Sequence, residues 1–415
     1  MVKKFNVPWG AWSGGNESHS LEFPEKWNVN LYSMNGSEDI TSPQAIQDAL
    51  KTPIGTPPIG EIAKGKKNAV VVVEDISRPT RCDLICEVIL DELNKAGIDD
   101  EHITLIGAIG SHRPMMREDY IKKVGLTTVE RINIENHHPY ENLVELGESN
   151  MGTPIHVNKT YYDAEVKIAV GTVIPHPLAG FGGGAKIILP GISGIETLAA
   201  NHARGLEGKG VGLGFITDIR KDIEEVCDRV GLDFNVNIIA TKDRGIAGIF
   251  AGHYIEAHRK AIELGKEVYK TELLEVSKDN KFDVGFFNLF PEDTELSQAG
   301  KGNNMFIQIE HLLKEEAVVV LLTSSYEGRG YHSLLGETGG KLHGEYMEGI
   351  DLLKEFCEEK TFMLYSPNLS RADVDHYWGE DMEFSKHFSE IIKKVEDISN
   401  TNPKAAIFPT SIQLF

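Results

Sequence analysis

Residues 69–73, an alanine followed by four valines, constrain the fold more than any other segment of the chain. A continuous β-branched run is typical of a strand that is buried on both faces of a parallel sheet. Apolar side chains at helical spacing follow at Ile85, Ile89 and Leu93, and a second apolar run occupies residues 103–106. This order of strand, helix and strand predicts a parallel βαβ unit.

The same alternation runs through the rest of the 415 residues. It predicts an α/β protein made of two doubly wound α/β domains, because a chain of this length exceeds one ordinary core. We expect one discontinuous domain from residues 1–100 and about 272–400, and a second from about 101–271 that residues 401–415 could join. Further strands are predicted near residues 132–135, 166–170, 234–240, 284–289, 318–322, 362–365 and 405–408, and helices over 217–230, 253–269 and 385–395.

The charge and hydropathy of the chain exclude several classes of protein. The formal net charge is -21 and no stripe is rich in lysine or arginine, which argues against a nucleic-acid partner. No apolar run approaches the roughly 20 residues of a membrane helix, and the N-terminus lacks the apolar stretch of a secretory signal. We therefore expect a cytoplasmic protein without a membrane span. Cys82 and Cys86 lie one helical turn apart without a second metal-binding pair, so we expect them to pack in the core.

Doubly wound sheets bind ligands at the carboxyl ends of their strands, so the loops that follow strands are candidate sites. The first, residues 74–80, places Asp75 and Arg78 close together. The guanidinium of Arg78 suits a carboxylate or phosphate, but a capping aspartate beside a surface arginine fits equally well. The second, residues 107–114, contains His112 and lacks the third glycine of a dinucleotide fingerprint. Taken alone, His112 fits a structural role better than a catalytic one.

Residues 171–191 form the most informative loop, because it combines a constrained histidine, a glycine run and a lysine. His176 lies between two prolines, which stiffen its backbone. The glycines at 182–184 before Lys186 suggest a phosphate cradle, but the neighbours of the lysine differ from those that a P-loop requires. Lys186 is therefore either a nucleophilic or covalently modified amine or a solvated loop lysine. On the next helix, His202 could reach the same site as a ligand, although packing is the commoner role.

Together and in order, these segments resemble the nickel-pincer lactate racemase family, and the resemblance runs through most of the chain. It implies a racemase or epimerase that inverts C2 of a 2-hydroxy acid by reversible hydride transfer. It also implies nickel and a pyridinium-3,5-bisthiocarboxylic acid mononucleotide in a cleft between the two domains, loaded by cofactor-synthesis and maturation proteins. The matching motifs are Asp75-x-x-Arg78, Gly-Ser-His-Arg-Pro at 110–114, the loop from His176 to Lys186, Leu-Pro-Gly at 189–191, Ala-Asn-His at 200–202, Phe-Ala-Gly at 250–252 and Gln298-Ala-x-Lys301-Gly.

The resemblance implies a role for each matching residue. Lys186 would hold the cofactor through a thioamide, and His202 would bind nickel. His112 and His176 would be paired general acid/bases, which suits racemisation because the hydroxyl proton is removed on one face and returned on the other. The residues implied in holding the cofactor and the anionic groups of the substrate are Asp75, Ile76, Ser77, Arg78, Gln298 and Lys301.

Ser297 departs from the family, which carries an aromatic residue at this position. A serine would open or polarise the pocket, so lactate is a doubtful substrate and a larger or more polar 2-hydroxy acid fits at least as well. Two alternatives remain open. A non-catalytic cofactor carrier of the same fold would keep Lys186 but would have no use for two bases. A nicotinamide-dependent dehydrogenase would need a Gly-x-Gly-x-x-Gly turn, and none follows Val73.

Overall fold

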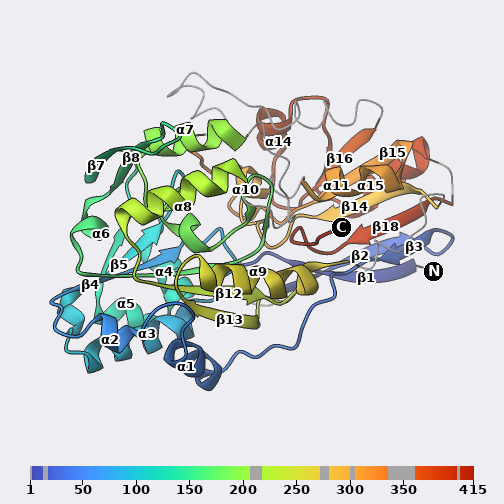
Figure 1. Cartoon of the computed structure of the whole chain (residues 1–415). Helices are drawn as coiled ribbons and strands as arrows, with labels where there is room; N and C mark the ends of the chain where they lie inside the picture. The colour runs from blue at the N-terminus through green and yellow to red at the C-terminus, as the bar shows by residue number, and fades with distance from the viewer. Residues whose placement is uncertain are drawn as a thin grey trace. The chain divides into compact units, whose positions relative to one another are not determined.

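The computed structural model describes residues 2–12, 17–205, 217–271, 280–299, 304–334, 360–399 and 402–415 (Figure 1). The chain divides into two compact units. Unit 1 comprises Met1–Gly36 and Tyr269–Phe415, and unit 2 comprises Ser37–Val268. Each unit is built around a six-stranded sheet. Among the described residues, we find no helix that combines the length and the hydropathy needed to cross a membrane.

The sheet of unit 2 has the strand order β13-β12-β9-β4-β5-β6 and is parallel except for the antiparallel pair of β12 and β13. In sequence order, β5 and β6 extend the sheet on one side of β4, and the later strands β9 and β12 extend it on the other side. This reversal creates a switch point between β4 and β9, where doubly wound sheets bind ligands. The strands are β4 (Ala69–Glu74), β5 (Ile103–Ala108), β6 (Asn133–Asn136), β9 (Val166–Thr172), β12 (Phe234–Ala240) and β13 (Ile246–Gly252).

Helices cover both faces of this sheet. The helix α3 packs with α1, α2, α4 and α5, whereas α8 packs with α7 and η2, and Figure 1 shows the two groups on opposite sides of the strands. The bounds are α1 (Pro43–Lys51), α2 (Ile59–Ile62), α3 (Asp83–Lys95), η1 (Asp100–His102), α4 (Arg117–Val124), α5 (Leu126–Arg131), α6 (Lys159–Asp163), η2 (Gly184–Ile187), α7 (Ile195–Gly205), α8 (Asp218–Val230) and α9 (Glu256–Tyr269). A hairpin of β7 (Leu143–Glu148) and β8 (Pro154–Asn158) is added to this unit.

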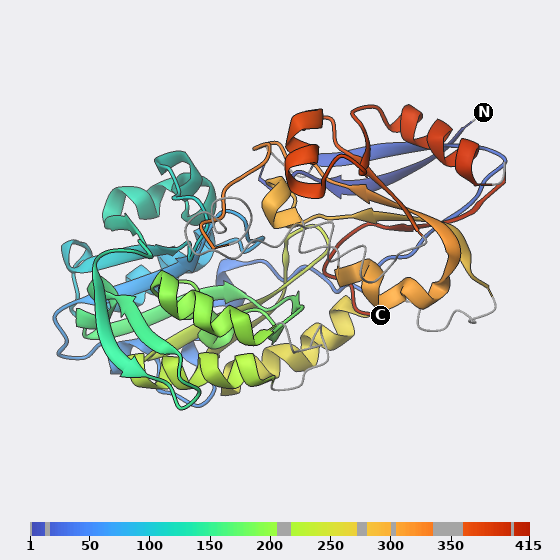
Figure 2. The same cartoon turned by 90° about the horizontal axis from the view of Figure 1, so that it is seen from above.

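The sheet of unit 1 is parallel throughout, in the order β17-β16-β15-β14-β18-β3. Successive residues of β15 face opposite sides, because side chains alternate along a strand. Val319 and Leu321 pack in a core with α10, α11 and α14, whereas Val318 and Val320 pack in a second core with α15 and the hairpin β1–β2 (Figure 2). The bounds are β1 (Val2–Trp9), β2 (Glu17–Pro24), β3 (Asn28–Leu31), β14 (Phe282–Asn288), α10 (Leu296–Ala299), α11 (Asn304–Ile309), η5 (Glu310–Leu312), β15 (Leu313–Leu322), β16 (Thr361–Tyr365), α14 (Arg371–Trp378), β17 (Glu383–Ser385), α15 (Phe388–Ile398) and β18 (Lys404–Phe408).

The α/β class is confirmed, but the division of the chain differs from the prediction in two respects. Residues 37–100 belong to unit 2 rather than to the first domain, because β4 is a central strand of the unit 2 sheet. Residues 401–415 do not join the second domain, because β18 pairs with β14 and β3 in unit 1. Both errors arise because strand neighbours in a sheet are set by tertiary pairing, which the order of elements along the chain leaves open.

Candidate functional site

Three loops and one helix meet at the carboxyl edge of the unit 2 sheet. Gly110, in the loop after β5, donates its N–H to the carbonyl of Gly191 at 2.9 Å. Its φ is +54°, and a Cβ at this position would lie 3.8 Å from Leu198 of α7. Gly110 therefore joins the loop after β5, the segment after η2 and helix α7.

The loop after β4 is connected to β9 by the partly buried side chain of Glu74 at the switch point. Glu74 accepts a hydrogen bond from the amide of Thr172 at 3.0 Å and another from the hydroxyl of Thr80. Burial raises the pKa of Glu74. On the other side, the fully buried Lys123 donates to the carbonyl of Arg78 at 2.9 Å, and burial lowers the pKa of this amine. The backbone that carries Asp75 and Arg78 is thus held from both sides.

Asp75 and His112 form a buried pair. A carboxylate oxygen of Asp75 lies 2.7 Å from Nδ1 of His112, and its other oxygen accepts the amide of Ser77 at 2.7 Å. Burial alone would raise the pKa of Asp75, but the charge and hydrogen bond of His112, with Arg78 and Ser77, hold it well below its ordinary value. Since an ionised carboxylate can only accept, Nδ1 of His112 carries the proton. In the neutral ring, Nε2 is then the basic nitrogen.

His176 has the opposite arrangement. It lies in β10 (Pro175–His176), which pairs with β11 (Gly180–Phe181) across a tight turn. The backbone amides of Leu178 and Ala179 both donate to its Nδ1, each at 3.2 Å. Because an amide N–H can only donate, Nδ1 of His176 is unprotonated and Nε2 carries the hydrogen of the neutral ring. In the neutral rings, Nε2 of His112 is therefore a hydrogen-bond acceptor and Nε2 of His176 is a donor.

The glycine run before Lys186 is required by close packing. Gly183 and Gly184 have φ of +69° and +60°, in the left-handed region. A Cβ on Gly183 would lie 2.6 Å from Cγ2 of Val173, and one on Gly184 would lie 2.9 Å from the ring of His258. Lys186 follows on η2 with its side chain half-buried, and its amide donates to the carbonyl of Gly183 at 3.3 Å.

His202 is oriented by its own helix. Its Nδ1 lies 2.9 Å from the carbonyl of Leu198, so Nδ1 carries the proton and the lone pair of the neutral ring is on Nε2, the form in which imidazole binds metals. The preceding residue, Asn201, is buried and donates to Asp222 of α8 at 2.8 Å. This bond fixes α7 against α8.

The remaining predicted residues have different surroundings. Ile76 and Ser77 are buried in the loop after β4, and Arg78 is partly exposed. Gln298 is buried in α10 of unit 1, whereas Lys301 lies outside the described residues. Cys82 and Cys86, which we expected in the core, are buried, and burial raises the pKa of Cys82 to about 12.

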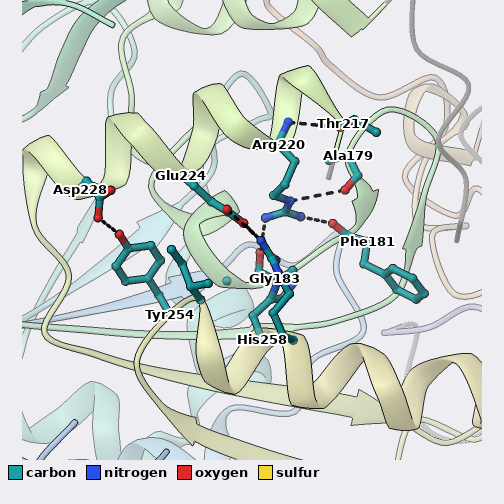
Figure 3. A network of polar contacts seen from close by, with 12 residues as sticks. Ala179, Phe181, Gly183, Thr217, Arg220, Glu224, Asp228, Tyr254 and His258 are labelled. Atoms are coloured by element: carbon teal, nitrogen blue, oxygen red, sulfur yellow. Dashed lines mark hydrogen bonds and ion pairs between the residues drawn. The ribbon is translucent and has the colours of Figure 1, made fainter. Parts of the chain in front are cut away.

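Sequence reasoning missed three residues whose side chains hydrogen-bond to the backbone of the glycine loop. Two of them, Arg220 on α8 and His258 on α9, are shown in Figure 3. The third is Asn237 on β12. One indication was available. Arg220 shares a helical face with Ile223, Cys227 and Val230, all buried, so the periodicity of α8 places this arginine in the interior.

The chain was compared with known proteins. The lactate racemase N-terminal domain family matches residues 15–214. The lactate racemase of Lactiplantibacillus plantarum is 25% identical over 391 residues, which cover 90% of each protein. That of Thermoanaerobacterium thermosaccharolyticum is 27% identical over 405 residues, which cover 92% of this chain and 91% of the relative.

Two solved structures share the fold. The lactate racemase apoprotein from Thermoanaerobacterium thermosaccharolyticum matches with a TM-score of 0.78 and 22% identity, over 100% of this chain and 99% of that one. A Thermotoga maritima protein matches with a TM-score of 0.68 and 19% identity, over 91% of this chain and 99% of that one. The matched domain, the length of the two sequence alignments and the shared fold agree: the chain resembles lactate racemases over about 90% of its length, and this resemblance indicates an isomerase.

Proposed function

We propose that this protein is a racemase or epimerase that inverts C2 of a 2-hydroxy acid with a nickel-pincer pyridinium mononucleotide. The observation that carries the proposal is the pair of opposite ring states of His112 and His176, on the loops after β5 and β9, the two strands that flank β4 in one sheet. Inversion at a carbinol carbon needs a base for the hydroxyl proton and a donor to the same oxygen. A purely structural pair of histidines has no need for complementary states.

The described residues fit the proposed cofactor. His202 offers one imidazole lone pair, and within the described part of the chain no group of three His, Cys, Asp or Glu side chains could enclose a metal ion. One protein ligand suits nickel that is already held by the sulfur and carbon donors of a pincer. Lys186 is the proposed attachment point through a thioamide. When bound, the cofactor supplies a pyridinium ring that accepts the C2 hydride and returns it.

The proton steps are assigned to the chain. Nε2 of His112 takes the hydroxyl proton, and the ionised Asp75 stabilises the imidazolium that forms. Nε2–H of His176 donates a hydrogen bond to the substrate oxygen. To return a proton to that oxygen, His176 must first become an imidazolium with hydrogens on both nitrogens, and to accept one at Nε2 its own hydrogen must move to Nδ1. In either case Nδ1 must release the amides of Leu178 and Ala179. His112 is therefore the readier base of the two.

The remaining roles concern binding. Arg78 is the proposed partner of the substrate carboxylate or the cofactor phosphate, because its guanidinium matches either geometry. Ser77, Ile76, Gln298 and Lys301 are proposed to hold the cofactor, which synthesis and maturation proteins would load in the cytoplasm. In unit 1, the hydroxyl of Ser297 donates to the buried Glu295. A polar pair in place of an aromatic ring favours a substrate that is larger or more polar than lactate.

Racemisation of pure enantiomers tests the proposed function. Protein co-expressed with pincer-synthesis enzymes should convert a D- or L-2-hydroxy acid to a mixture of both forms, followed by chiral chromatography. We expect faster conversion of acids with larger or more polar side chains than of lactate. Protein expressed without those enzymes is the control. A nickel-loaded protein that interconverts none of the panel would contradict the proposal.

His202→Ala should lower nickel retention while the mass adduct on Lys186 persists, because the metal ligand and the attachment point are separate residues. The measurement is nickel per chain after dialysis, paired with intact mass. His156→Ala is a matched control, since His156 also lies in unit 2 but contacts Glu196 near the surface. Equal nickel content in His202→Ala and the parent would remove His202 from the metal site.

A further inference from the structure

Arg220 is a buried cation whose hydrogen bonds go to backbone carbonyls. Only 2% of the residue is exposed. Its guanidinium donates to the carbonyls of Ala179 at 3.4 Å, of Gly183 at 3.2 Å and of Phe181 (Figure 3). Burial lowers the pKa of Arg220 to about 10, so it remains charged at neutral pH. All three acceptors lie in the loop that precedes Lys186.

The acidic residue one turn along α8 has another partner. Glu224 binds Arg259 of α9 through both carboxylate oxygens, at 2.6 and 2.8 Å. Buried arginines are usually paired with carboxylates, because an unpaired buried charge is costly. The charge of Glu224 favours the charged form of Arg220, but the hydrogen bonds of Glu224 go to Arg259. The guanidinium of Arg220 donates instead to the carbonyls of the loop, whose dipoles also stabilise its charge. The loop conformation and the buried charge therefore depend on each other.

His258 holds the fourth carbonyl of this loop. Its Nε2 lies 2.7 Å from the carbonyl of Gly182, and Arg259 donates to its Nδ1 at 2.9 Å. A carbonyl can only accept and a guanidinium can only donate, so His258 is the neutral tautomer with its hydrogen on Nε2. Burial, followed by the charges of Arg220 and Arg259, lowers its pKa well below the ordinary value, which agrees with a neutral ring.

These contacts extend to the backbone of Lys186 through a shared carbonyl. The carbonyl of Gly183 accepts from Arg220 and also from the amide of Lys186, at 3.2 and 3.3 Å. The amide of Gly184 donates to the side-chain oxygen of Asn237 in β12 at 2.9 Å. The backbone at Lys186 is thus connected to α8 through one shared carbonyl and to the sheet through one amide.

We propose that Arg220, assisted by His258, is the positioning residue for Lys186: it fixes the glycine loop so that the lysine amine is presented at the edge of the sheet before any cofactor binds. The significance of this for cofactor attachment rests on the proposed function. Neither side chain takes part in the chemistry, and the proposal adds no covalent step.

Hydrogen exchange of the apoprotein tests the positioning without a cofactor. Arg220→Gln removes the charge and should accelerate exchange in the peptide covering residues 179–190 by about tenfold or more, whereas peptides from β4 and β5 keep the parental rate. Arg229→Lys is the matched control, because Arg229 lies on the same helix and binds Glu225 and the carbonyl of Glu148 near the surface. Parental exchange in the 179–190 peptide of a folded Arg220→Gln protein overturns the proposal.

Two variants of His258 test the proposal if Arg220→Gln does not fold. His258→Gln retains a neutral donor for Gly182, and His258→Leu removes it. Loop exchange should be fast in the leucine variant and close to parental in the glutamine variant, and equal rates in the two would overturn the proposal.

Measuring cofactor attachment distinguishes a failure of this inference from a failure of the proposed function. Arg220→Gln co-expressed with pincer-synthesis enzymes should carry at least tenfold less of the mass adduct per folded chain than Arg229→Lys. If the loop exchange changes as expected but even the parent gains no adduct, the positioning stands and the proposed function fails. If the parent loads and Arg220→Gln loads equally well, the positioning of Lys186 by Arg220 is wrong.

Discussion

Lys186→Ala is expected to abolish cofactor attachment and to reduce 2-hydroxy acid interconversion below detection. The reason is chemical, since the amine is the proposed covalent link and alanine offers no nucleophile. Condensation of an amine with a thiocarboxylic acid to a thioamide releases one water. The parental holoprotein should therefore gain the cofactor mass less one water, on a peptide that contains Lys186, and the variant should gain none.

Two further variants make the result specific. Lys186→Arg keeps a positive charge but cannot form the thioamide, so it should also carry no adduct. Lys159→Ala removes an exposed lysine of α6, paired with Asp163, and should load like the parent. Melting temperatures of the apoproteins should agree closely, because the Lys186 side chain is half-buried at a loop. An adduct of unchanged mass in Lys186→Ala would rule out this attachment point.

The sequence was sufficient to locate the central strands of both sheets, because burial on two faces leaves a distinct pattern. The valines of β4 are all buried, and the predicted strand over residues 234–240 matches β12. The edge strands β3, β13 and β17 and the hairpins β1–β2 and β7–β8 were not predicted. Strands in hairpins that are covered on one side carry weaker periodicity, and their partners are set by contacts formed after the sheet is in place.

The sequence predicted which loops lie at the carboxyl edge of the sheet, but not the ring states of their histidines. Loops after β4, β5 and β9 were chosen because ligands bind at carboxyl ends of strands, and the switch point between β4 and β9 agrees with that choice. The protonation states of His112 and His176 depend on which neighbour lies beside Nδ1, a carboxylate in one case and two amides in the other. Such neighbours are tertiary contacts, and no spacing in the sequence encodes them.

The glycine run shows that a motif can have more than one physical cause. A run of glycines before a lysine suggests a phosphate cradle, but Gly183 and Gly184 are required because Val173 and His258 leave no room for a Cβ. The buried Arg220 that completes this packing comes from α8, more than 30 residues further along the chain. Close packing and ligand approach both select glycine, so composition alone cannot separate them.

His112→Ala is expected to lower the rate of interconversion by about 10²- to 10⁴-fold, the usual effect of removing a general base, while nickel and the Lys186 adduct stay at parental levels. His176→Ala should also lose activity, because the substrate oxygen loses its donor. The measurement is the initial rate per loaded chain with the best substrate. Parental rates in both folded, loaded variants would refute the two-histidine mechanism, and a loss of melting temperature with unchanged rate would assign the histidines a structural role.

The pH profile distinguishes Asp75 from His112 within their pair. The pKa of Asp75 is held well below its ordinary value. Its carboxylate therefore stays ionised over the acidic limb of the rate–pH profile, where the rate falls as the pH is lowered. The limb should therefore reflect proton uptake by the basic nitrogen of His112, with the rate falling toward low pH. Asp75→Asn removes the charge that stabilises the imidazolium, so the limb should move to lower pH and the maximal rate should fall by up to about 10⁴-fold. His176→Ala leaves the Asp75–His112 pair intact and should lower the plateau without moving the limb. A limb that stays in place in Asp75→Asn would show that Asp75 does not act through His112.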